Sequence, residues 1–337
     1  MRVLYVGHYQ PGCTTWARGQ QLIEILKPSV FQVVDIDQPI NNTPRLFRSF
    51  GWRFYKGPLI HRINSYIEEQ IKGKPKYDLV WIDKGVFIRP AILKRLSMEG
   101  STLVHYTPDT AFAYNRSKLF FDALPLYNHC ITTKSFELEE YRKMGAQGIH
   151  YSTQGYDPLL HKKYYTMEEK DGIVFIGLHE EWREKVVEAI VSARMKISIG
   201  GAGWKGFALK MKNNPYFHYL GESLFHEQYA RAISKSKISI GLLSRRFSEK
   251  HTTRTFEIPA CFTALATERN DEILSFYMEN EVIYFGDIPE LIQKLSRALS
   301  DPEYLELITV NGFNRVRSGG YDYKSILENL VKEMGLK

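Results

Sequence analysis

The sequence predicts an α/β fold in which two Rossmann-like domains face a central cleft. Short apolar, β-branched runs recur along the chain with amphipathic stretches of helical length between them, which is typical of doubly wound α/β proteins. Several runs are apolar at successive residues, which indicates strands buried on both faces, as in parallel sheets. A turn-rich and then polar segment that begins at Gly155 divides the runs into two similar sets.

We expect a strand wherever such a run lies between turn-forming residues. In the first half of the chain the expected strands are residues 3–6, 33–36, 79–82, 103–106 and 131–132. In the second half they are residues 173–176, 197–199, 218–220, 238–242, 264–266 and 282–285. Apolar residues at helical spacing predict helices within residues 180–192 and 225–234.

The turn from Gly155 to Pro158 is the expected boundary between the domains. It gives a first domain at residues 1–158 and a second domain at residues 159–320. We expect a C-terminal helix within residues 321–337 to pack back on the first domain. Because ligands of open α/β sheets bind at the carboxyl ends of the strands, we expect the functional residues in strand-end loops.

The composition is that of an ordinary globular protein. Of 337 residues, 44% are apolar and 25% are charged, which excludes a disordered chain, collagen and a coiled coil. Three Cys without a C-x-x-C spacing disfavour a disulfide framework and a structural zinc site, and favour a reducing compartment. No apolar run approaches the ~20 residues of a membrane span, and the N-terminus is typical of a buried strand rather than a signal peptide. We therefore expect a cytoplasmic protein.

The positive charge of the chain lies in its first half. Residues 1–155 hold 20 Lys and Arg against 13 Asp and Glu, whereas the remainder holds 25 of each class. Such an excess favours anionic partners, although a solvated basic face is the plainer alternative. Residues 45–56 interleave Arg with large apolar side chains, a pattern that fits peripheral binding to the inner face of an anionic membrane. A partly buried connecting segment explains the same pattern, and stacking on nucleic acid is not favoured.

The sharpest motif is the segment from Ser248 to Ala260, which follows an expected strand and opens a helix. Lys250 and Arg254 next to that helix start would attract a phosphate group. Glu249 and Glu257 lie eight residues apart, and Glu257 could accept hydrogen bonds from two vicinal hydroxyls, as on a ribose. The alternative is a solvated charged loop that leads into a surface helix.

This segment resembles the signature of GT-B glycosyltransferases of the CgeB (spore maturation protein) type, in which Arg-x-Phe-Glu heads a helix that runs into Ala-Cys-Gly. The two Glu also resemble the paired glutamates of retaining GT-B enzymes. That resemblance implies that Glu257 binds the donor ribose and that Glu249 lies near the transferred sugar. Phe262 stands where the family has Gly, so the turn at this position departs from the family pattern.

Other strand-end turns resemble the same family in the expected order. The resemblance implies that Gly177 lets a loop approach the donor diphosphate and that Arg183 pairs with it. Gly203 and Leu220 resemble the next two turns, and the turn at Leu220 would lie beside the nucleotide base. Two further matches are the strand entry at residues 76–81 and the interdomain hinge at residues 155–158.

The first domain is then expected to supply the acceptor side. The loop that contains His8 and Gly12 has Gly at two turns and could approach phosphate or sugar, although a simple turn is the alternative. Asp109 follows an expected strand and resembles a family carboxylate that orients or deprotonates an acceptor hydroxyl. His105 is a second catalytic candidate, with a packed core histidine as the alternative.

No metal or other cofactor is expected. The one Asp-x-Asp motif near a sheet, Asp35-Ile36-Asp37, lies at a strand end and fits a structural role. The leaving diphosphate would then be stabilised by Arg183, Lys250 and Arg254 in place of a divalent ion.

The function predicted from these features is metal-independent transfer of a sugar from a nucleotide-diphosphate sugar to an acceptor hydroxyl, with retention of configuration. The acceptor would be a glycan, a lipid-linked molecule or a protein, in cell-envelope or surface glycan synthesis. Two alternatives remain open: a nucleotide-sugar 2-epimerase of the same architecture, and a non-catalytic carbohydrate-binding or scaffold protein that keeps the fold.

Overall fold

The computed structural model describes residues 1–11, 13–113 and 116–336. The chain divides into two compact units, and each is described here by itself. Unit 1 comprises Met1–Thr153 together with the C-terminal residues from Lys324 onward, and unit 2 comprises Gln154–Tyr323. The units therefore meet in sequence at residues 153 and 154, a little before the boundary at residue 158 drawn from the turn signals.

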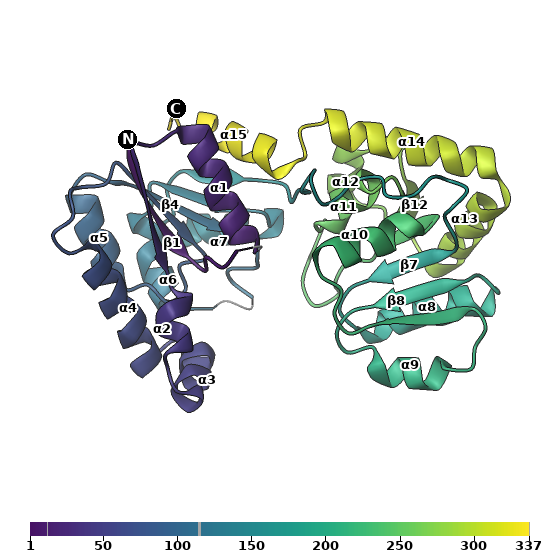
Figure 1. Cartoon of the computed structure of the whole chain (residues 1–337), viewed down its shortest axis with the longest axis horizontal. Coiled ribbons are helices and arrows are strands. Elements are labelled where there is room, and N and C mark those ends of the chain that lie inside the picture. The colour runs from purple at the N-terminus through teal and green to yellow at the C-terminus, as the bar shows by residue number, and fades with distance from the viewer. Residues whose placement is uncertain (12, 114–115, 337) are drawn as a thin grey trace. The chain divides into compact units, whose positions relative to one another are not determined.

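Unit 1 contains a parallel sheet of six strands in the order β2-β1-β3-β4-β5-β6 (Figure 1). The strands are β1 (Arg2–Gly7), β2 (Val30–Asp35), β3 (Leu79–Asp83), β4 (Thr102–Thr107), β5 (His129–Thr132) and β6 (Ile149–Tyr151). Alternate residues of β1 pack into two separate cores: Leu4 into the core beneath α4 and α5, and Tyr5 into the core beneath α1 and α15. Both faces of the sheet are thus covered, which is why its strands are apolar at successive positions.

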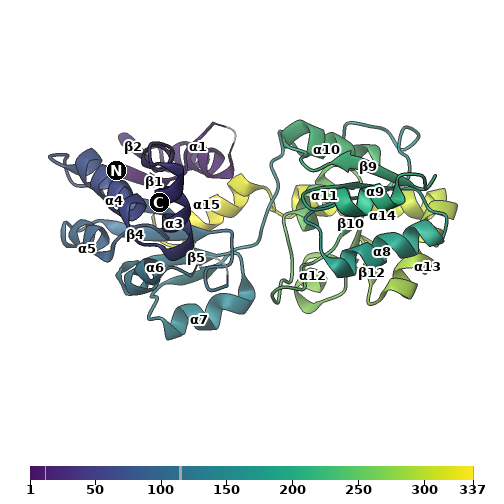
Figure 2. The ribbon, with the colours of Figure 1, turned by 90° about the horizontal axis from the view of Figure 1, so that it is seen from below.

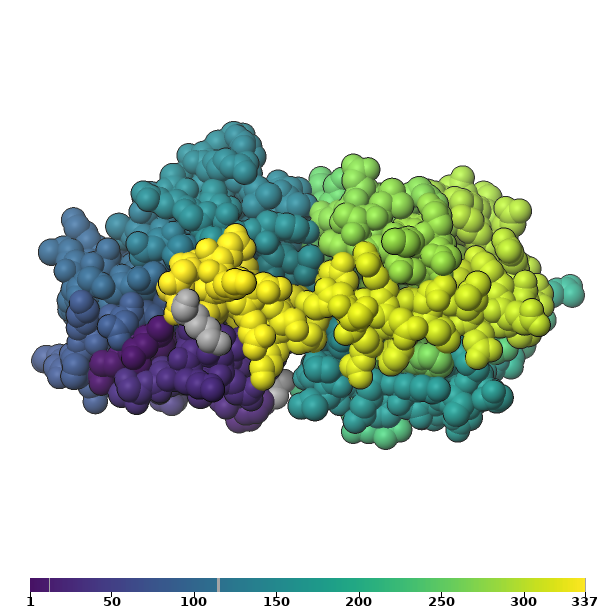
Figure 3. Space-filling view, turned by 90° about the horizontal axis from the view of Figure 1, so that it is seen from above, coloured from purple at the N-terminus to yellow at the C-terminus, as the bar shows by residue number. Residues whose placement is uncertain are grey.

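Helices cover unit 1 on both faces of this sheet. They are α1 (Thr14–Leu26), α2 (Asp37–Asn41), α3 (Arg45–Phe54), α4 (Pro58–Ile71), α5 (Pro90–Met98), α6 (Lys118–Ala123), α7 (Leu138–Lys143) and α15 (Tyr323–Glu333), with 3₁₀ turns at Leu124–Leu126 and Ser135–Glu137. Figure 3 shows the C-terminal segment lying over the N-terminal part of unit 1, where Leu327 and Val331 pack with Leu22 of α1.

Unit 2 contains a second parallel sheet of six strands, in the order β12-β11-β10-β7-β8-β9 (Figure 2). The strands are β7 (Ile173–Ile176), β8 (Ile197–Gly200), β9 (Phe217–Gly221), β10 (Ile238–Gly241), β11 (Ala264–Glu268) and β12 (Ile283–Phe285). The helices are α8 (Glu181–Ser192), α9 (Lys205–Met211), α10 (His226–Lys235), α11 (Arg254–Ala260), α12 (Asp271–Phe276), α13 (Ile288–Ser300) and α14 (Pro302–Ser318). Phe175 and Val174 of β7 again belong to different cores on opposite faces.

The expected α/β fold with two parallel sheets is confirmed, and each expected strand overlaps an observed one. One observed strand, β6, was not among the strands expected from the sequence. Ile149–Tyr151 is only three residues long, carries His150 at its centre and lies at the edge of the sheet, so it has no continuous apolar run. Among the described residues, no helix is long and apolar enough to span a membrane.

The turns after β7 and β8, at the carboxyl edge of the unit 2 sheet, pack tightly against each other. Gly177 N–H donates to the Gly200 carbonyl, and the Trp204 indole donates to the Gly177 carbonyl, both at 2.9 Å. A Cβ on Gly201 would lie 2.2 Å from that same carbonyl oxygen, and Gly201 has φ +124°. Only glycine satisfies both the spacing and the backbone conformation at this position.

We expect Gly201→Ala to destabilise unit 2 by at least about 2 kcal/mol, because the new methyl group meets the Gly177 carbonyl and the backbone is strained. Thermal unfolding monitored by circular dichroism measures the effect. Gly206→Ala is the matched control, since nothing lies within 4 Å of a Cβ there. Gly206 lies in α9, so this change should leave stability unchanged or raise it by up to about 1 kcal/mol. Equal midpoints for the two variants would contradict the tight packing of these turns.

Candidate functional site

The charged segment singled out in the sequence lies at the carboxyl edge of the unit 2 sheet. Glu249 and Lys250 are in the loop that leaves β10, and Arg254 and Glu257 are in the short helix α11 that follows it. The loop folds back on itself, because Ser244 N–H donates to Glu249 Oε2 at 3.2 Å. The side chain of Lys250 has no ion pair in the part of the chain that the structure describes.

Glu257 is a buried carboxylate with its two oxygens in different surroundings. Its Oε2 accepts hydrogen bonds from the Tyr229 hydroxyl at 2.6 Å and from the Thr253 hydroxyl at 3.0 Å. Its Oε1 lies 3.7 Å from His161 Nε2, beyond hydrogen-bond distance. Burial and the neighbouring Glu257 raise the pKa of Tyr229 well above its usual value, so Tyr229 stays a hydroxyl donor. The carboxylate is therefore fixed by one oxygen and has acceptor capacity left on the other.

Arg254 and Arg183 converge beside Gly177 at the end of β7. Their guanidinium carbons lie 6.0 Å and 5.4 Å from the centre of the Phe175 ring. Arg254 Nη1 donates to the Ile176 carbonyl at 3.4 Å and would lie 3.4 Å from a Cβ on Gly177. The Nε atoms of both arginines are buried and have no hydrogen-bond partner among the described residues. Two cations with spare donors in one place are suited to bind an anion.

Arg183 differs from Arg254 in how firmly the protein holds it. It is only 3% exposed, and it donates to the carbonyls of Leu178 at 2.7 Å and Leu242 at 3.2 Å. It also forms an ion pair with Glu180 at 3.4 Å. Burial, followed by repulsion from Arg254, lowers the pKa of Arg183 to about 10. Arg183 thus joins the ends of β7 and β10 as well as contributing positive charge.

The remaining predicted positions of unit 2 lie at the same edge. Gly203, with φ +87°, is in the tightly packed turn after β8, where a Cβ would lie 2.9 Å from His179 Cβ. Leu220 is half-buried near the end of β9, and a Cβ on Gly200 would lie 3.5 Å from its own Cβ. The structure therefore gathers the unit 2 residues from five separate segments at one sheet edge.

Phe262, the residue that departs from the family pattern, adopts the backbone conformation in which glycine is favoured. It has φ +58° at the end of α11, which is uncommon for a bulky side chain. Its ring packs edge-on against Phe313 at 5.3 Å and lies 4.2 Å from the Lys163 ammonium. The turn thus keeps a left-handed conformation without glycine, with the ring contacts offsetting the strain.

At the carboxyl edge of the unit 1 sheet, His8 lies 2.6 Å from Asp37, measured from Nδ1 to Oδ1. His8 also lines a small pocket of about 10 Å³ together with Lys84, Gly85 and Phe87. Gly12, the other predicted residue of this loop, lies outside the described residues. Asp35 accepts a hydrogen bond from Tyr9 N–H at 3.0 Å, consistent with the structural role expected for the Asp35-Ile36-Asp37 segment.

Asp109 and His105 occupy different surroundings. Asp109 lies after β4 with its side chain 47% exposed, and its Oδ2 pairs with Lys84 Nζ at 2.6 Å. His105 is fully buried within β4, where its Nε2 lies 3.1 Å from the Lys84 carbonyl and burial lowers its pKa to about 4. His105 packs against Phe120 and Tyr127, so its position is that of a core histidine and does not support contact with an acceptor.

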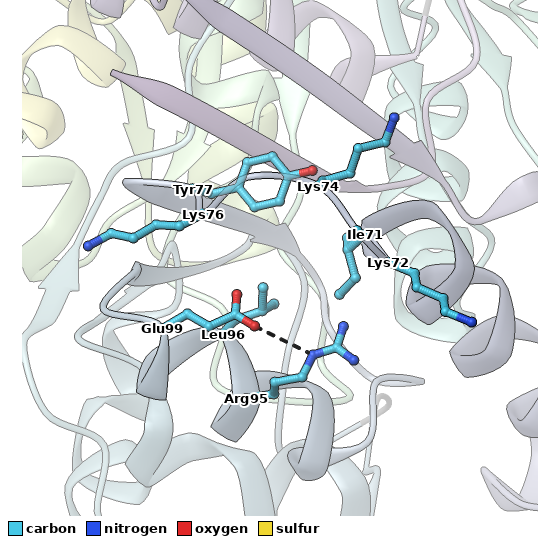
Figure 4. Close-up of a pocket in the computed structure, with 9 residues that line it drawn as sticks. Ile71, Lys72, Lys74, Lys76, Tyr77, Arg95, Leu96 and Glu99 are labelled. Atoms are coloured by element: carbon cyan, nitrogen blue, oxygen red, sulfur yellow. Dashed lines mark ion pairs between the residues drawn. The ribbon is translucent and has the colours of Figure 1, made fainter.

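A larger pocket of about 250 Å³ lies at the opposite, amino-terminal end of β3 and is lined by Lys72, Lys74, Lys76 and Arg95 among others (Figure 4). Lys72 caps the C-terminus of α4, and Arg95 lies in the last turn of α5, where it approaches Glu99. Cations at helix C-termini are stabilised by the helix dipole. Lys72 and Arg95 therefore have a structural explanation.

Sequence reasoning missed three groups at these edges. His161 lies in the polar segment interpreted as a linker, yet it is 4% exposed and faces Glu257. Tyr229 of α10 holds the same carboxylate, and Lys84 of unit 1 pairs with Asp109. For Lys84 the sequence offered a signal, because a Lys-Gly pair directly follows an expected strand. For His161 and Tyr229 it offered none, because their contacts with Glu257 join distant parts of the chain. Within the described residues, no cluster of three or more His, Cys, Asp or Glu is arranged to hold a metal ion.

Loss of the charge should affect the stability of the protein differently at Arg183 and at Arg254. We expect Arg183→Met to lower the free energy of unfolding by about 2–4 kcal/mol, because two buried carbonyls and Glu180 lose their partner. Arg254→Met should change it by no more than about 1 kcal/mol, since it loses one long hydrogen bond and a like-charged neighbour. Urea unfolding followed by fluorescence measures both values, and a larger loss in Arg254→Met would contradict this division of roles.

The comparisons with known proteins address the class of this chain. Residues 180–332 match the model of the family described as glycosyl transferase-like. No curated protein matches the chain. Among solved structures, Anabaena Alr3699/HepE in complex with UDP is 13% identical, with 100% of both chains covered and a TM-score of 0.66. A structure described as trehalose-6-phosphate from E. coli bound with UDP-2-fluoro glucose is 9% identical, with 99% of both chains covered and a TM-score of 0.66.

A third similar structure is an α,α-trehalose-phosphate synthase from Burkholderia xenovorans in complex with glucose-6-phosphate. It is 9% identical, with 99% of this chain and 100% of the other covered and a TM-score of 0.62. The TM-scores and the coverage show a shared fold, whereas the low identities show no more than the fold. The family match covers most of unit 2 and much of α15. The chain therefore has the GT-B fold, and residues 180–332 are similar to the glycosyl transferase-like family.

Proposed function

We propose that the carboxyl edge of unit 2 binds a nucleotide-diphosphate sugar, with UDP as the nucleotide, and that the chain transfers the sugar to an acceptor hydroxyl. The observation that carries this proposal is the pair of arginines beside Gly177 with unpartnered Nε atoms, next to a buried carboxylate with one oxygen in reserve. The similar structures described with UDP or UDP-2-fluoro glucose support the choice of nucleotide.

Each part of the donor has a matching group in unit 2. Arg254 and Lys250 would bind the diphosphate, while Arg183 supports this site from beneath. Oε1 of Glu257 would accept hydrogen bonds from the ribose hydroxyls, because Oε2 is already taken by Tyr229 and Thr253. The half-buried Leu220 would lie against the base.

The proposed reaction breaks the bond between the anomeric carbon of the sugar and the diphosphate oxygen, and forms a bond from that carbon to the acceptor oxygen. Positive charge from Arg254 and Lys250 stabilises the leaving diphosphate, so no divalent ion is required. The proton of the acceptor hydroxyl passes to the leaving phosphate oxygen. Asp109 of unit 1 is proposed to orient an acceptor hydroxyl. Glu249 is proposed to lie near the transferred sugar. The resemblance of Glu249 and Glu257 to the paired glutamates of retaining GT-B enzymes supports retention of configuration.

The acceptor would be a glycan, a lipid-linked molecule or a protein of the cell envelope or surface, with unit 1 as its binding domain. The basic character of residues 1–155 supports an anionic acceptor or an anionic surface. The three Cys without a C-x-x-C spacing support a cytoplasmic location, and the basic, aromatic residues 45–56 support a place at the inner face of the membrane. The motif from Arg254 to Cys261 supports the CgeB-type branch.

Calorimetric titrations with UDP and with uridine test the donor site. Glu257→Gln should weaken both ligands at least about tenfold, because both contain the ribose and a hydrogen bond to a charged group contributes about 1.5–3 kcal/mol. Arg254→Met should weaken UDP at least about tenfold and leave uridine unchanged, since uridine has no phosphate. Glu303→Gln, an exposed residue of α14, is the matched control and should bind like the wild type.

Unchanged UDP affinity in folded Glu257→Gln and Arg254→Met would contradict the assigned site. Incubation with labelled UDP-sugars and EDTA then tests the reaction. Release of UDP in EDTA supports metal-independent transfer, whereas loss of turnover that Mg²⁺ or Mn²⁺ restores would overturn it. A 2-epimer as the product would identify an epimerase, and binding without turnover of any UDP-sugar would identify a scaffold.

A further inference from the structure

Helix α3 of unit 1 exposes an unusual number of large apolar side chains. Leu46 is 77% exposed, Phe54 50%, Phe50 46% and Phe47 44%. Figure 1 shows α3 at the lower tip of unit 1, beyond α2. Trp52 of the same helix is 42% exposed. Scattered single apolar residues are normal on a protein surface, but a group of five on one short helix indicates an interaction surface.

Four of these side chains form one continuous face of α3, those of Leu46, Phe47, Phe50 and Phe54. Leu46, Phe50 and Phe54 are spaced four residues apart and lie in line along the helix, and the Phe50 and Phe54 rings are 4.9 Å apart. Gly51 is the buried residue of α3 and faces α4, where a Cβ on it would lie 2.5 Å from Leu59 Cβ. The close fit of Gly51 on α4 holds the helix down while its aromatic side chains remain in solvent.

The charged residues of α3 and its neighbours in the sequence are all basic. From Gln38 to Ile67 the sequence contains no Asp or Glu, whereas Arg45, Arg48, Arg53, Lys56 and Arg62 are basic. None of these five has an ion pair in the described part of the chain. A second copy of the chain would bring the same positive charges against this face and repel it. An anionic partner with an apolar interior matches both the charge and the exposed aromatic rings.

We propose that α3 docks unit 1 on an anionic phospholipid surface, with Leu46, Phe50 and Phe54 inserted between the headgroups. Arg45, Arg48 and Arg53 then contact lipid phosphates, since long basic side chains keep their charge in the headgroup layer while their stems lie along apolar surface. Both contributions are required, because a short apolar face alone binds weakly and charge alone gives only loose, salt-sensitive attraction.

Trp52 connects this surface to the pocket of unit 1. Its ring lies 6.3 Å from the His8 ring, nearly parallel to it, and 4.7 Å from the Phe87 ring, edge-on. His8 and Phe87 both line the small pocket at the carboxyl edge of the sheet. Docking through α3 would therefore bring that pocket next to the lipid surface. This conclusion about the acceptor rests on the proposed function. The acceptor that this arrangement favours is a molecule carried by the lipid surface.

Co-sedimentation of the full chain with lipid vesicles tests the docking. At low salt, the wild type should bind vesicles of phosphatidylcholine mixed with phosphatidylglycerol, and it should not bind vesicles of phosphatidylcholine alone. The triple variants Arg45→Glu/Arg48→Glu/Arg53→Glu and Leu46→Ser/Phe50→Ser/Phe54→Ser should each lose binding, the former by more than about 100-fold. The matched control is Lys72→Glu/Lys74→Glu/Lys76→Glu, which changes the same charge at exposed positions on the opposite end of the unit and should keep binding.

Every other outcome overturns the docking surface. A wild type that ignores anionic vesicles contradicts it, and equal loss in the α3 and control charge variants would show general attraction only. A concentration-dependent dimer abolished by the apolar variant would identify a second copy as the partner. Binding to a single-stranded oligonucleotide lost in the same variants would identify nucleic acid.

Titration of the same proteins with UDP separates this inference from the proposed function. Both α3 variants should keep the UDP affinity of the wild type, since unit 2 is unchanged. Vesicle binding without UDP binding would overturn the proposed function and leave the docking surface intact. With labelled UDP-sugar and vesicles of total cell lipid, label should enter the organic phase, and label found only in water-soluble product would contradict a surface-borne acceptor.

Discussion

The unit 2 edge depends on the absence of side chains around one peptide group, that of Gly177. Its N–H and carbonyl are both used, by Gly200 and by the Trp204 indole, while Gly201 packs against the carbonyl. Arg254 takes the remaining side of Gly177. Because neighbouring groups contact Gly177 on several sides, they fix the positions of the turns after β7 and β8 and of the start of α11 relative to one another. The groups proposed to bind the donor are carried by those same segments.

Electrostatics favours a ligand at this edge. Burial and then repulsion from Arg254 lower the pKa of Arg183, while Glu180, Glu249 and Glu268 offset part of the positive charge. Like charges brought together under partial burial raise the energy of the free protein, and a bound anion would relieve that repulsion. Arg183 is therefore held as a structural cation that also sets the field at the site, whereas Arg254 keeps the freedom to contact a ligand.

The sequence was informative where local pattern decides the structure. Strands that are buried on both faces appear in the sequence as apolar runs. The order of strands and helices then places Gly177, Arg254 and Glu257 at one edge of a sheet, independently of side-chain packing. It was uninformative where packing decides. His161 looked like part of a polar linker, and alternation along β4 turned His105 into the core two residues before the edge. The short edge strand β6 left no apolar run to detect.

Hydrogen exchange of the full chain with and without saturating UDP tests the central claim that unit 2 holds the donor site at this edge. The account predicts slower exchange of backbone amides in residues 177–183 and 249–257, with unit 1 unchanged. Amides at both places lie in loops or at helix starts, where exchange is fast enough to report a bound ligand. Protection confined to residues 7–11 and 83–88 of unit 1, or no protection anywhere, would contradict it.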